Sequence, residues 1–280
     1  MHPAVVAWAP AVLPAPVTEV ADRSWPDGKS SVHQVQDGDG SGWFIKHHRD
    51  REWYSAEVAA YRRWVPALGD RAPVLHAHND SLCTIVVSTL RASGRQDWHD
   101  DNVRRDAGVA LRALHGAESF GPWEDIAAAK QAELERWTRR GAGLLSDAET
   151  GIAKRCVTAL AGLPAPERVP CHRDYTPRNW IIDNGRVRVI DFEETQPDAW
   201  MSDIGRMTIG FWPGQPHLTD AVLDGYGRRL SADDEATAAC LFAVSAVKYI
   251  VLGAELGKRD FVAGMRHVLR RVDPCRPAGS

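Results

Sequence analysis

The 280-residue sequence lacks closely spaced cysteines, a large net charge and a long uninterrupted apolar run. Its five cysteines stand singly and form no Cys-x-x-Cys pair; they are Cys83, Cys156, Cys171, Cys240 and Cys275. This spacing argues against a disulfide framework or a structural zinc site, and it predicts reduced thiols in a cytoplasmic protein. The formal net charge of -3 gives no electrostatic reason to expect a nucleic-acid or acidic-membrane partner.

Signals for secretion or membrane insertion are also missing. Residues 1–20 contain no Lys or Arg, and four prolines interrupt the apolar helix that a signal peptide needs: Pro3, Pro10, Pro14 and Pro16. We therefore expect this segment to belong to the mature fold. The other long apolar stretch, residues 236–256, contains Ser245, Lys248 and Glu255, and so predicts a buried core helix and no membrane span.

Two common ligand-binding loops are incomplete in this sequence. Gly28-Lys29-Ser30 resembles the end of a phosphate-binding P-loop, but Arg23 occupies the position of the partner glycine. Asp37-x-Asp39-x-Ser41 resembles a calcium-binding loop, but His48 stands where the closing glutamate is required. We therefore expect neither a P-loop nor a calcium site.

Alternating and helical patterns predict a small sheet followed by a helical region. The expected strands are residues 32–36, 43–46, 76–79 and 82–87, and the expected helices are residues 52–65, 101–116, 124–140, 147–163 and the apolar helix that starts after Ser231. Ser146 and Glu149 form a capping box at the start of one of these helices. The sequence shows no internal repeat and no low-complexity linker.

A tight β-hairpin is predicted near residue 184. Asn184-Gly185 lies between two runs rich in Ile and Val, and both residues tolerate the positive φ angles of a two-residue turn. Counting back from this turn pairs Ile182 with Val187, and Trp180 with Val189. The prediction fixes which side chains meet at the open end of the hairpin.

Three oxygen-bearing side chains are expected to converge at that open end. Asn179 falls almost opposite Ile190, one step from Asp191, and Asp174 precedes them by a loop that Pro177 keeps from being helical. An Asp that can take a hydroxyl proton, beside an Asn and an Asp that can bind hard cations, is what phosphoryl transfer from a magnesium nucleotide requires.

These residues carry a resemblance to a known family. His172-Arg173-Asp174, then Asn179, then Asp191-Phe192 after one hairpin look like the catalytic and metal loops of the protein-kinase-like fold. The sequence of residues 172–179 and 189–193 is most similar to that of the aminoglycoside phosphotransferase family within that fold. The resemblance implies an α+β, bilobal architecture, with an N-lobe over residues 1–87, a hinge at 88–91 and a helical C-lobe at 92–280.

The resemblance also implies a nucleotide site. Lys46, at the end of a predicted strand, would hold the α- and β-phosphates of ATP or GTP and pair with Glu57 on the next helix. Ser30 and Ser31 would contact phosphates from a loop over the nucleotide. Two hinge residues, Ser88 and Leu90, would contact adenine through main-chain atoms.

The implied reaction is transfer of the γ-phosphoryl group to a hydroxyl. Asp174 would act as the general base, and Asn179 and Asp191 would bind Mg²⁺. His172 and Asp203 would support the catalytic loop, with Asp203 accepting hydrogen bonds from its backbone.

The acceptor is less well defined. Glu193 and Glu194 add negative charge beside the expected acceptor site, which suits a cationic antibiotic such as an aminoglycoside or a tuberactinomycin-type peptide, although solvated carboxylates after a strand would look the same. A macrolide, choline or homoserine are alternative acceptors, and the chain could be a monomer or a dimer. Arg178 stands where small-molecule kinases often have Gly, and its role is open.

Two other classes are disfavoured. A protein kinase would carry an Ala-Pro-Glu element and a long activation segment between Asp191 and Asp203, and neither is present. A non-catalytic, kinase-shaped binding protein would have lost one of the four key side chains, and all four are present: Lys46, Asp174, Asn179 and Asp191.

Overall fold

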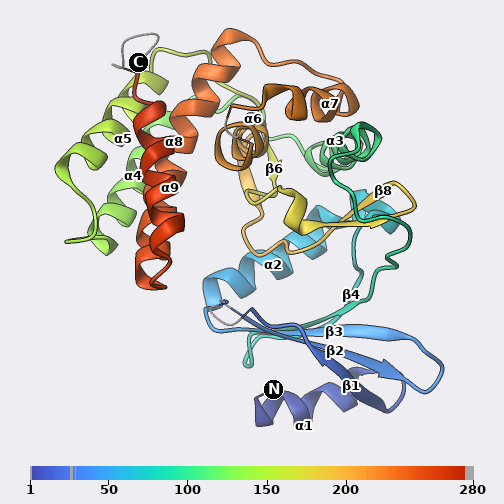
Figure 1. Cartoon of the computed structure of the whole chain (residues 1–280). Coiled ribbons are helices and arrows are strands. Elements are labelled where there is room, and N and C mark those ends of the chain that lie inside the picture. The colour runs from blue at the N-terminus through green and yellow to red at the C-terminus, as the bar shows by residue number, and fades with distance from the viewer. Residues whose placement is uncertain (1, 26–27, 29, 213, 275–280) are drawn as a thin grey trace.

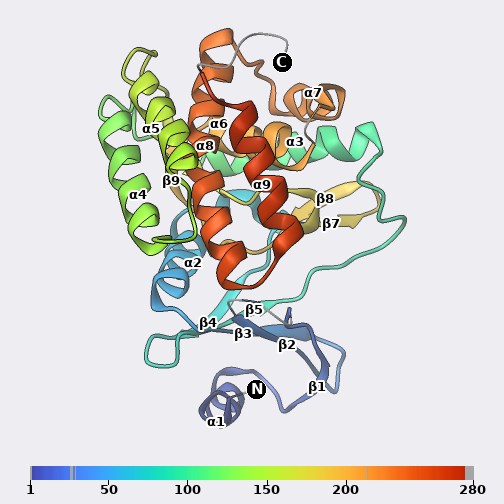
Figure 2. The ribbon, with the colours of Figure 1, turned by 60° about the vertical axis from the view of Figure 1, so that its left-hand side comes forward.

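The computed structural model describes residues 2–25, 28, 30–212 and 214–274. Figure 1 shows an antiparallel sheet at the N-terminal end of the molecule and a larger, mainly helical region beyond it, with helix α2 between them. The same division is visible after a 60° rotation in Figure 2. This mixture of elements is an α+β fold.

The sheet has five strands in the order β1-β2-β3-β5-β4, and every neighbouring pair is antiparallel. Its strands are β1 Val17–Asp22, β2 Ser30–Asp37, β3 Gly42–His48, β4 Leu75–Asn79 and β5 Thr84–Ser88. The four predicted strands are therefore present, with ends that shift by a residue or two. In β3, Trp43 and Ile45 alternate with more exposed neighbours and face a small apolar core.

Helix α1 covers that small core. It spans Pro3–Val12 and buries Val5 and Ala9 against the sheet. The prediction that prolines prevent a helix here is wrong. Pro3 lies in the first turn, where a missing N–H costs nothing, and the burial of one helix face outweighs the hydrogen bond that Pro10 removes.

Helix α2, Arg51–Arg63, begins at Asp50, whose carboxylate accepts a hydrogen bond from the Glu52 amide at 2.7 Å. It buries Tyr54, Glu57 and Tyr61 and ends before the 3₁₀ segment Val65–Arg71. The predicted helix over 52–65 is thus present. It places Glu57 beside Lys46 of β3.

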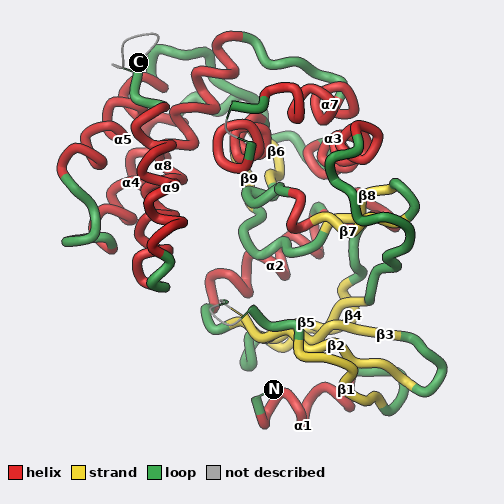
Figure 3. Tube along the Cα trace, in the orientation of Figure 1, coloured by secondary structure: helices red, strands yellow, loops and turns green. Residues whose placement is uncertain are grey.

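The remaining chain is mostly helical and also holds two small antiparallel sheets, the pair β6 with β9 and the hairpin of β7 and β8 (Figure 3). Its elements are α3 Asp101–His115, α4 Ile126–Arg140, α5 Asp147–Leu160, β6 Arg168–Cys171, β7 Trp180–Asp183, β8 Arg186–Val189, β9 Gln196–Ala199, α6 Met201–Gly205, a π-helical turn Arg206–Phe211, α7 Pro216–Tyr226, α8 Ala232–Glu255 and α9 Arg259–Arg271. The predicted capping box of Ser146 and Glu149 is present at the start of α5. Helices α7 and α9 were not predicted.

Helix α8 is the one described helix that is long and apolar enough, by length and composition, to cross a membrane. Within its most apolar window, 78% of the residues are buried inside the fold. Burial against α4, α5, α6 and α9 explains its apolar composition, in agreement with the predicted core helix.

Helices α3 and α7 approach closely at glycines. A Cβ atom added to Gly108 of α3 would lie 2.0 Å from the Val222 carbonyl oxygen of α7, well inside any permitted contact. A Cβ atom added to Gly264 of α9 would have no atom within 4 Å, so this glycine provides a matched comparison.

We therefore expect Gly108→Ala to lower the free energy of unfolding by about 3 kcal/mol, because backbone atoms must move apart to accept the methyl group. Gly264→Ala should raise it by up to about 1 kcal/mol, since alanine favours the helix. Urea unfolding followed by tryptophan fluorescence measures both. Equal stability of the two variants would contradict the packing described.

Candidate active site

The hairpin of β7 and β8 forms as predicted. Asn184 and Gly185 have φ angles of 51° and 82°, and the register pairs Trp180 with Val189. The Ile190 amide donates to the Asn179 carbonyl oxygen at 3.1 Å, one residue before Asp191. The turn therefore brings the backbone of Asn179 next to that of Asp191.

The side chain of Asn179 is oriented by Asp174. Its amide nitrogen donates to the Asp174 carbonyl oxygen at 2.9 Å and to Asp174 Oδ2 at 3.0 Å. Both acceptors are oxygens, so the Asn179 Oδ1 must point the other way. An amide oxygen and a carboxylate are ligands that Mg²⁺ prefers, and the backbones of Asn179 and Asp191 are adjacent, so these residues fit the metal that the family resemblance implies.

Asp191 and Arg173 have positive φ angles, 68° and 64°, which are uncommon for residues other than glycine. Such backbone strain is held in place by surrounding contacts and concentrates at functional sites. At Asp191 the contact is an ion pair, because its Oδ1 lies 2.6 Å from Lys46 Nζ.

Lys46 is buried among carboxylates from three segments. Its Nζ lies 2.9 Å from Glu57, 2.6 Å from Asp191 and 3.0 Å from Glu193. Burial alone lowers the pKa of Lys46, but the charges of Asp191, Glu57 and Glu193 outweigh it and hold the pKa well above its ordinary value. The predicted contact between Lys46 and Glu57 is present in the structure.

His48 joins the same cluster, which the sequence did not reveal. Its Nε2 lies 2.8 Å from Glu57, and its Nδ1 lies 3.7 Å from Glu193. Burial raises the pKa of Glu57, but Lys46 and His48 together lower it below its ordinary value. His48, Glu57 and Glu193 are close enough to ligate a metal, but the Lys46 ammonium already supplies the positive charge there.

Asp203 anchors the start of the catalytic loop. Its carboxylate accepts the His172 amide at 2.8 Å, the Arg173 amide at 2.6 Å and His115 Nε2 at 3.0 Å. Burial raises the pKa of Asp203, but His115 and the His172 amide lower it below its ordinary value. His115 also bonds the Tyr226 hydroxyl at 2.9 Å. Asp203 thus accepts the backbone hydrogen bonds that were expected. It also accepts one from His115, which the sequence did not predict.

His172 ties the loop to the hairpin. The ring is fully buried, and its Nε2 donates to the Ile190 carbonyl oxygen at 3.0 Å. The ring also contacts Phe192, with centroids 5.2 Å apart. These contacts match the supporting role predicted for His172.

Two arginines bind the Asp174 carboxylate. Arg178 donates to Oδ2 at 2.6 Å, and Arg206 lies 3.2 Å from Oδ1. The Arg206 guanidinium is buried over the Tyr249 ring, 4.5 Å from its centroid. Sequence reasoning missed Arg206, although it follows Asp203 by three positions and shares its helical face.

Glu193 and Glu194 form ion pairs that the sequence did not predict. Both are buried, Glu193 against Lys46 and Glu194 in an ion pair with Lys248 of α8. Glu194 therefore has a lysine partner within the fold, whereas Glu193 shares Lys46 with Glu57 and Asp191. The negative charge that was predicted to attract a cationic acceptor is offset in part by these lysines.

The predicted phosphate and hinge residues lie at strand ends. Ser30 and Ser31 open β2, directly after the loop that connects it to β1. Ser88 still belongs to β5, and its amide donates to the Val74 carbonyl oxygen at 2.9 Å, so this N–H is not available to adenine. Leu90 follows β5, and its predicted contact stays a prediction.

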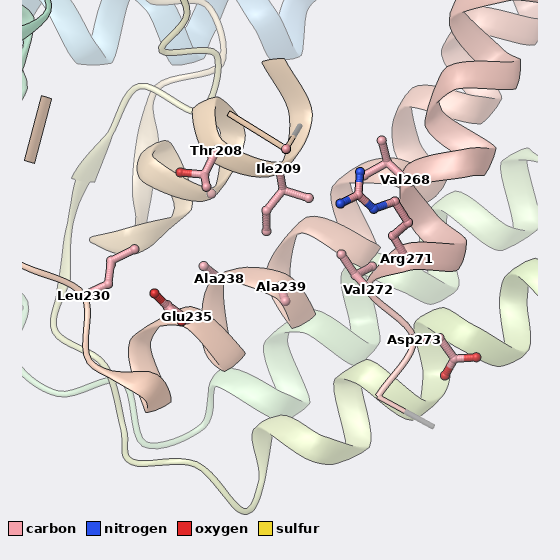
Figure 4. Close-up of a pocket in the computed structure, with 12 residues that line it drawn as sticks. Thr208, Ile209, Leu230, Glu235, Ala238, Ala239, Val268, Arg271, Val272 and Asp273 are labelled. Carbon is pink, nitrogen blue, oxygen red and sulfur yellow. The ribbon is translucent and has the colours of Figure 1, made fainter. Parts of the chain in front are cut away.

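A pocket of about 520 Å³ lies elsewhere, between the π-helical turn, the start of α8 and the end of α9 (Figure 4). Gly205, Thr208 and Ile209 line it, whereas Arg206 of the same segment contacts Asp174. The residues predicted for catalysis do not line this pocket, so it is separate from the candidate site.

We expect Asp203→Ala to lower the free energy of unfolding by about 3 kcal/mol at pH 7, because two buried amides lose their acceptor. The pKa of Asp203 is depressed in the folded chain, so its stabilisation is present above pH 3.8 and is lost as pH falls through the lower folded value. Urea unfolding measures the effect. Asp70→Ala, in an exposed pair with Arg186, is the control, and an equal loss in both variants would contradict the anchoring role.

Comparison with known proteins places this geometry in a family. The model of a phosphotransferase enzyme family, APH, matches residues 25–240. No curated protein sequence gives a significant match.

Solved structures give the same fold at low identity. A thermostable mutant of the aminoglycoside phosphotransferase APH(4)-Ia is 18% identical, with a TM-score of 0.70 over 94% of this chain and 96% of that one. The macrolide 2'-phosphotransferase MphH from Brachybacterium faecium is 15% identical, with a TM-score of 0.61 over 93% and 92%. A choline/ethanolamine kinase family protein from Mesorhizobium loti is 17% identical, with a TM-score of 0.66 over 96% and 93%.

The predicted kinase-like α+β fold and the predicted phosphotransferase activity class are therefore confirmed. Identities below 20% leave the acceptor open. The chain belongs to the phosphotransferase enzyme family to which aminoglycoside phosphotransferases give their name.

Proposed function

We propose that this protein transfers the γ-phosphoryl group of ATP or GTP to a hydroxyl group of a small molecule, with Mg²⁺. The observation that carries the proposal is one cluster of side chains. Asp174, Asn179 and Asp191 meet at the open end of a hairpin, and Lys46 reaches Asp191 from the sheet. These are the groups that orient a hydroxyl, bind a metal and bind phosphates in kinase-type phosphoryl transfer.

Each side chain would have a distinct task. Asp174 would orient the acceptor hydroxyl and take its proton. Asn179 and Asp191 would hold Mg²⁺, which offsets the charge of the phosphates. Lys46, steadied by Glu57, would bind the α- and β-phosphates. Lys46 stays cationic in this role, because the carboxylates around it raise its pKa.

We propose a small antibiotic as the acceptor, with aminoglycosides and tuberactinomycin-type peptides first to be tested. Support comes from the family and from the similarity to an aminoglycoside phosphotransferase. The acceptor would reach the enzyme in the cytoplasm.

A less cationic acceptor, such as a macrolide or a hydroxylated metabolite, is a second candidate. It is favoured by the charges beside Asp174. Glu194 is paired with Lys248, and Glu133 lies 2.7 Å from Arg173 and 3.1 Å from Lys130. A site whose acidic groups are paired in this way has little excess negative charge with which to select a polycation.

A panel of acceptors separates these candidates. Magnesium-dependent nucleotide turnover would be measured with an aminoglycoside, a tuberactinomycin-type peptide, a macrolide, choline and homoserine. Turnover with the first two supports a cationic antibiotic, and turnover with one of the others supports the second candidate. Nucleotide binding with no turnover on any acceptor would favour a non-catalytic binding protein.

We expect Asp174→Asn to retain the fold and nucleotide binding but to lower kcat about a hundred- to ten-thousand-fold, because the general base is lost. Asp183→Asn, at the other end of the same hairpin, removes a carboxylate that pairs with Arg188 and should keep kcat within about twofold. Steady-state kinetics with the accepted substrate measures both. Normal turnover by the Asp174 variant would refute its assignment.

A further inference from the structure

The Asp174 carboxylate is fully engaged by its neighbours. Arg206 contacts Oδ1 through two nitrogens at 3.2 and 3.3 Å. Oδ2 accepts hydrogen bonds from Arg178 at 2.6 Å and from Asn179 at 3.0 Å. A general base must have an oxygen within hydrogen-bond reach of the hydroxyl that it deprotonates. One of these donors must therefore leave before Asp174 can act.

The two arginines differ in how firmly they are held. The Arg206 side chain is 7% exposed and stacks on the Tyr249 ring, so it has little room to move. The Arg178 side chain is 53% exposed, and among the described residues its ion-pair partner is Asp174 alone. An exposed pair of this kind contributes little free energy and separates easily. Arg178 is thus the donor that can leave.

The position of Arg178 in the chain places it close to where the γ-phosphoryl group of the nucleotide would bind. It lies on the 3₁₀ turn Pro177–Asn179, between the base Asp174 and the metal ligand Asn179. In the proposed reaction, the γ-phosphoryl group would pass from the β-phosphate to the hydroxyl that Asp174 orients, close to this turn. A guanidinium at this point matches the charge and geometry of phosphoryl oxygens.

We propose that Arg178 is a movable cap on Asp174, which turns to the γ-phosphoryl group of the bound nucleotide and so uncovers Oδ2 for the acceptor hydroxyl. The proposal rests on the proposed function and extends it to a residue whose role the sequence left open. The phosphoryl oxygens replace the carboxylate as the partner of the guanidinium. Arg206 meanwhile keeps the carboxylate in place.

The transfer step that follows forms one bond to phosphorus and breaks another. The acceptor oxygen forms a bond to the γ-phosphorus as its proton passes to Asp174 Oδ2. The bond between the γ-phosphorus and the β,γ-bridging oxygen breaks, and the nucleoside diphosphate leaves with that oxygen. Arg178 stays with the transferred phosphoryl group until the product departs and then returns to Asp174.

Nucleotide binding tests this role without knowledge of the acceptor. We would measure the Kd of the β,γ-imido analogue of ATP and of ADP, each with Mg²⁺, by calorimetry for wild type, Arg178→Gln and Arg178→Lys. Arg186→Gln is the matched control, because Arg186 is similarly exposed on β8 and pairs with Asp70. If the wild-type chain prefers guanine nucleotides, the same pair of guanine ligands is used.

We expect Arg178→Gln to raise the Kd of the triphosphate analogue about tenfold and to leave the Kd of ADP within about twofold of wild type. The reason is that only the triphosphate carries the group that Arg178 binds. Arg178→Lys should recover part of the loss, and Arg186→Gln should change neither affinity.

Unchanged affinity of Arg178→Gln for both ligands would overturn the proposal. If the same variant also showed a raised KM for the acceptor, Arg178 would be assigned to an anionic group of the acceptor. An equal loss for both ligands would also overturn it, since that pattern reports a disturbed loop. A wild-type chain that binds neither nucleotide would overturn the proposed function itself and this proposal with it.

Discussion

The buried positive charge of Lys46 is the constraint on which the active site depends. It comes from β3, the middle strand of the sheet, and the carboxylates around it come from α2 and from the segment after β8. A buried ammonium needs close partners, and removal of one partner from a buried pair typically costs about 3–5 kcal/mol. The sheet, α2 and the catalytic hairpin are therefore held in one arrangement by the group that would bind the nucleotide phosphates.

A second set of polar contacts fixes the other half of the site. Asp203 binds two amides of the catalytic loop, His172 bonds the carbonyl oxygen before Asp191, and Asp174 turns the amide of Asn179. Two residues in this region adopt positive φ angles that isolated chains disfavour. The loop conformation is thus imposed by buried hydrogen bonds, and the proposed phosphoryl transfer depends on that conformation.

The features that sequence alone predicted are those fixed by local chemistry. The Asn184-Gly185 turn sets the hairpin register, which in turn sets the neighbours of Asn179, and the Ser146 capping box sets the start of α5. Helix α1 was missed because tertiary burial outweighs its prolines. Contacts between distant segments were also missed: His48 with Glu57, His115 with Asp203, and Arg206 with Asp174. The lysine partners of Glu193 and Glu194 were missed as well, because Lys46 and Lys248 are far away in sequence.

In the proposed function, Asn179 and Asp191 hold the metal of a bound nucleotide. A crystal structure with Mg²⁺ and the β,γ-imido analogue of ATP would show whether they do. We predict a magnesium ion bonded to Asn179 Oδ1 and an Asp191 carboxylate oxygen, with the γ-phosphoryl group directed towards Asp174. A nucleotide bound away from the hairpin, or a metal that contacts neither side chain, would contradict it.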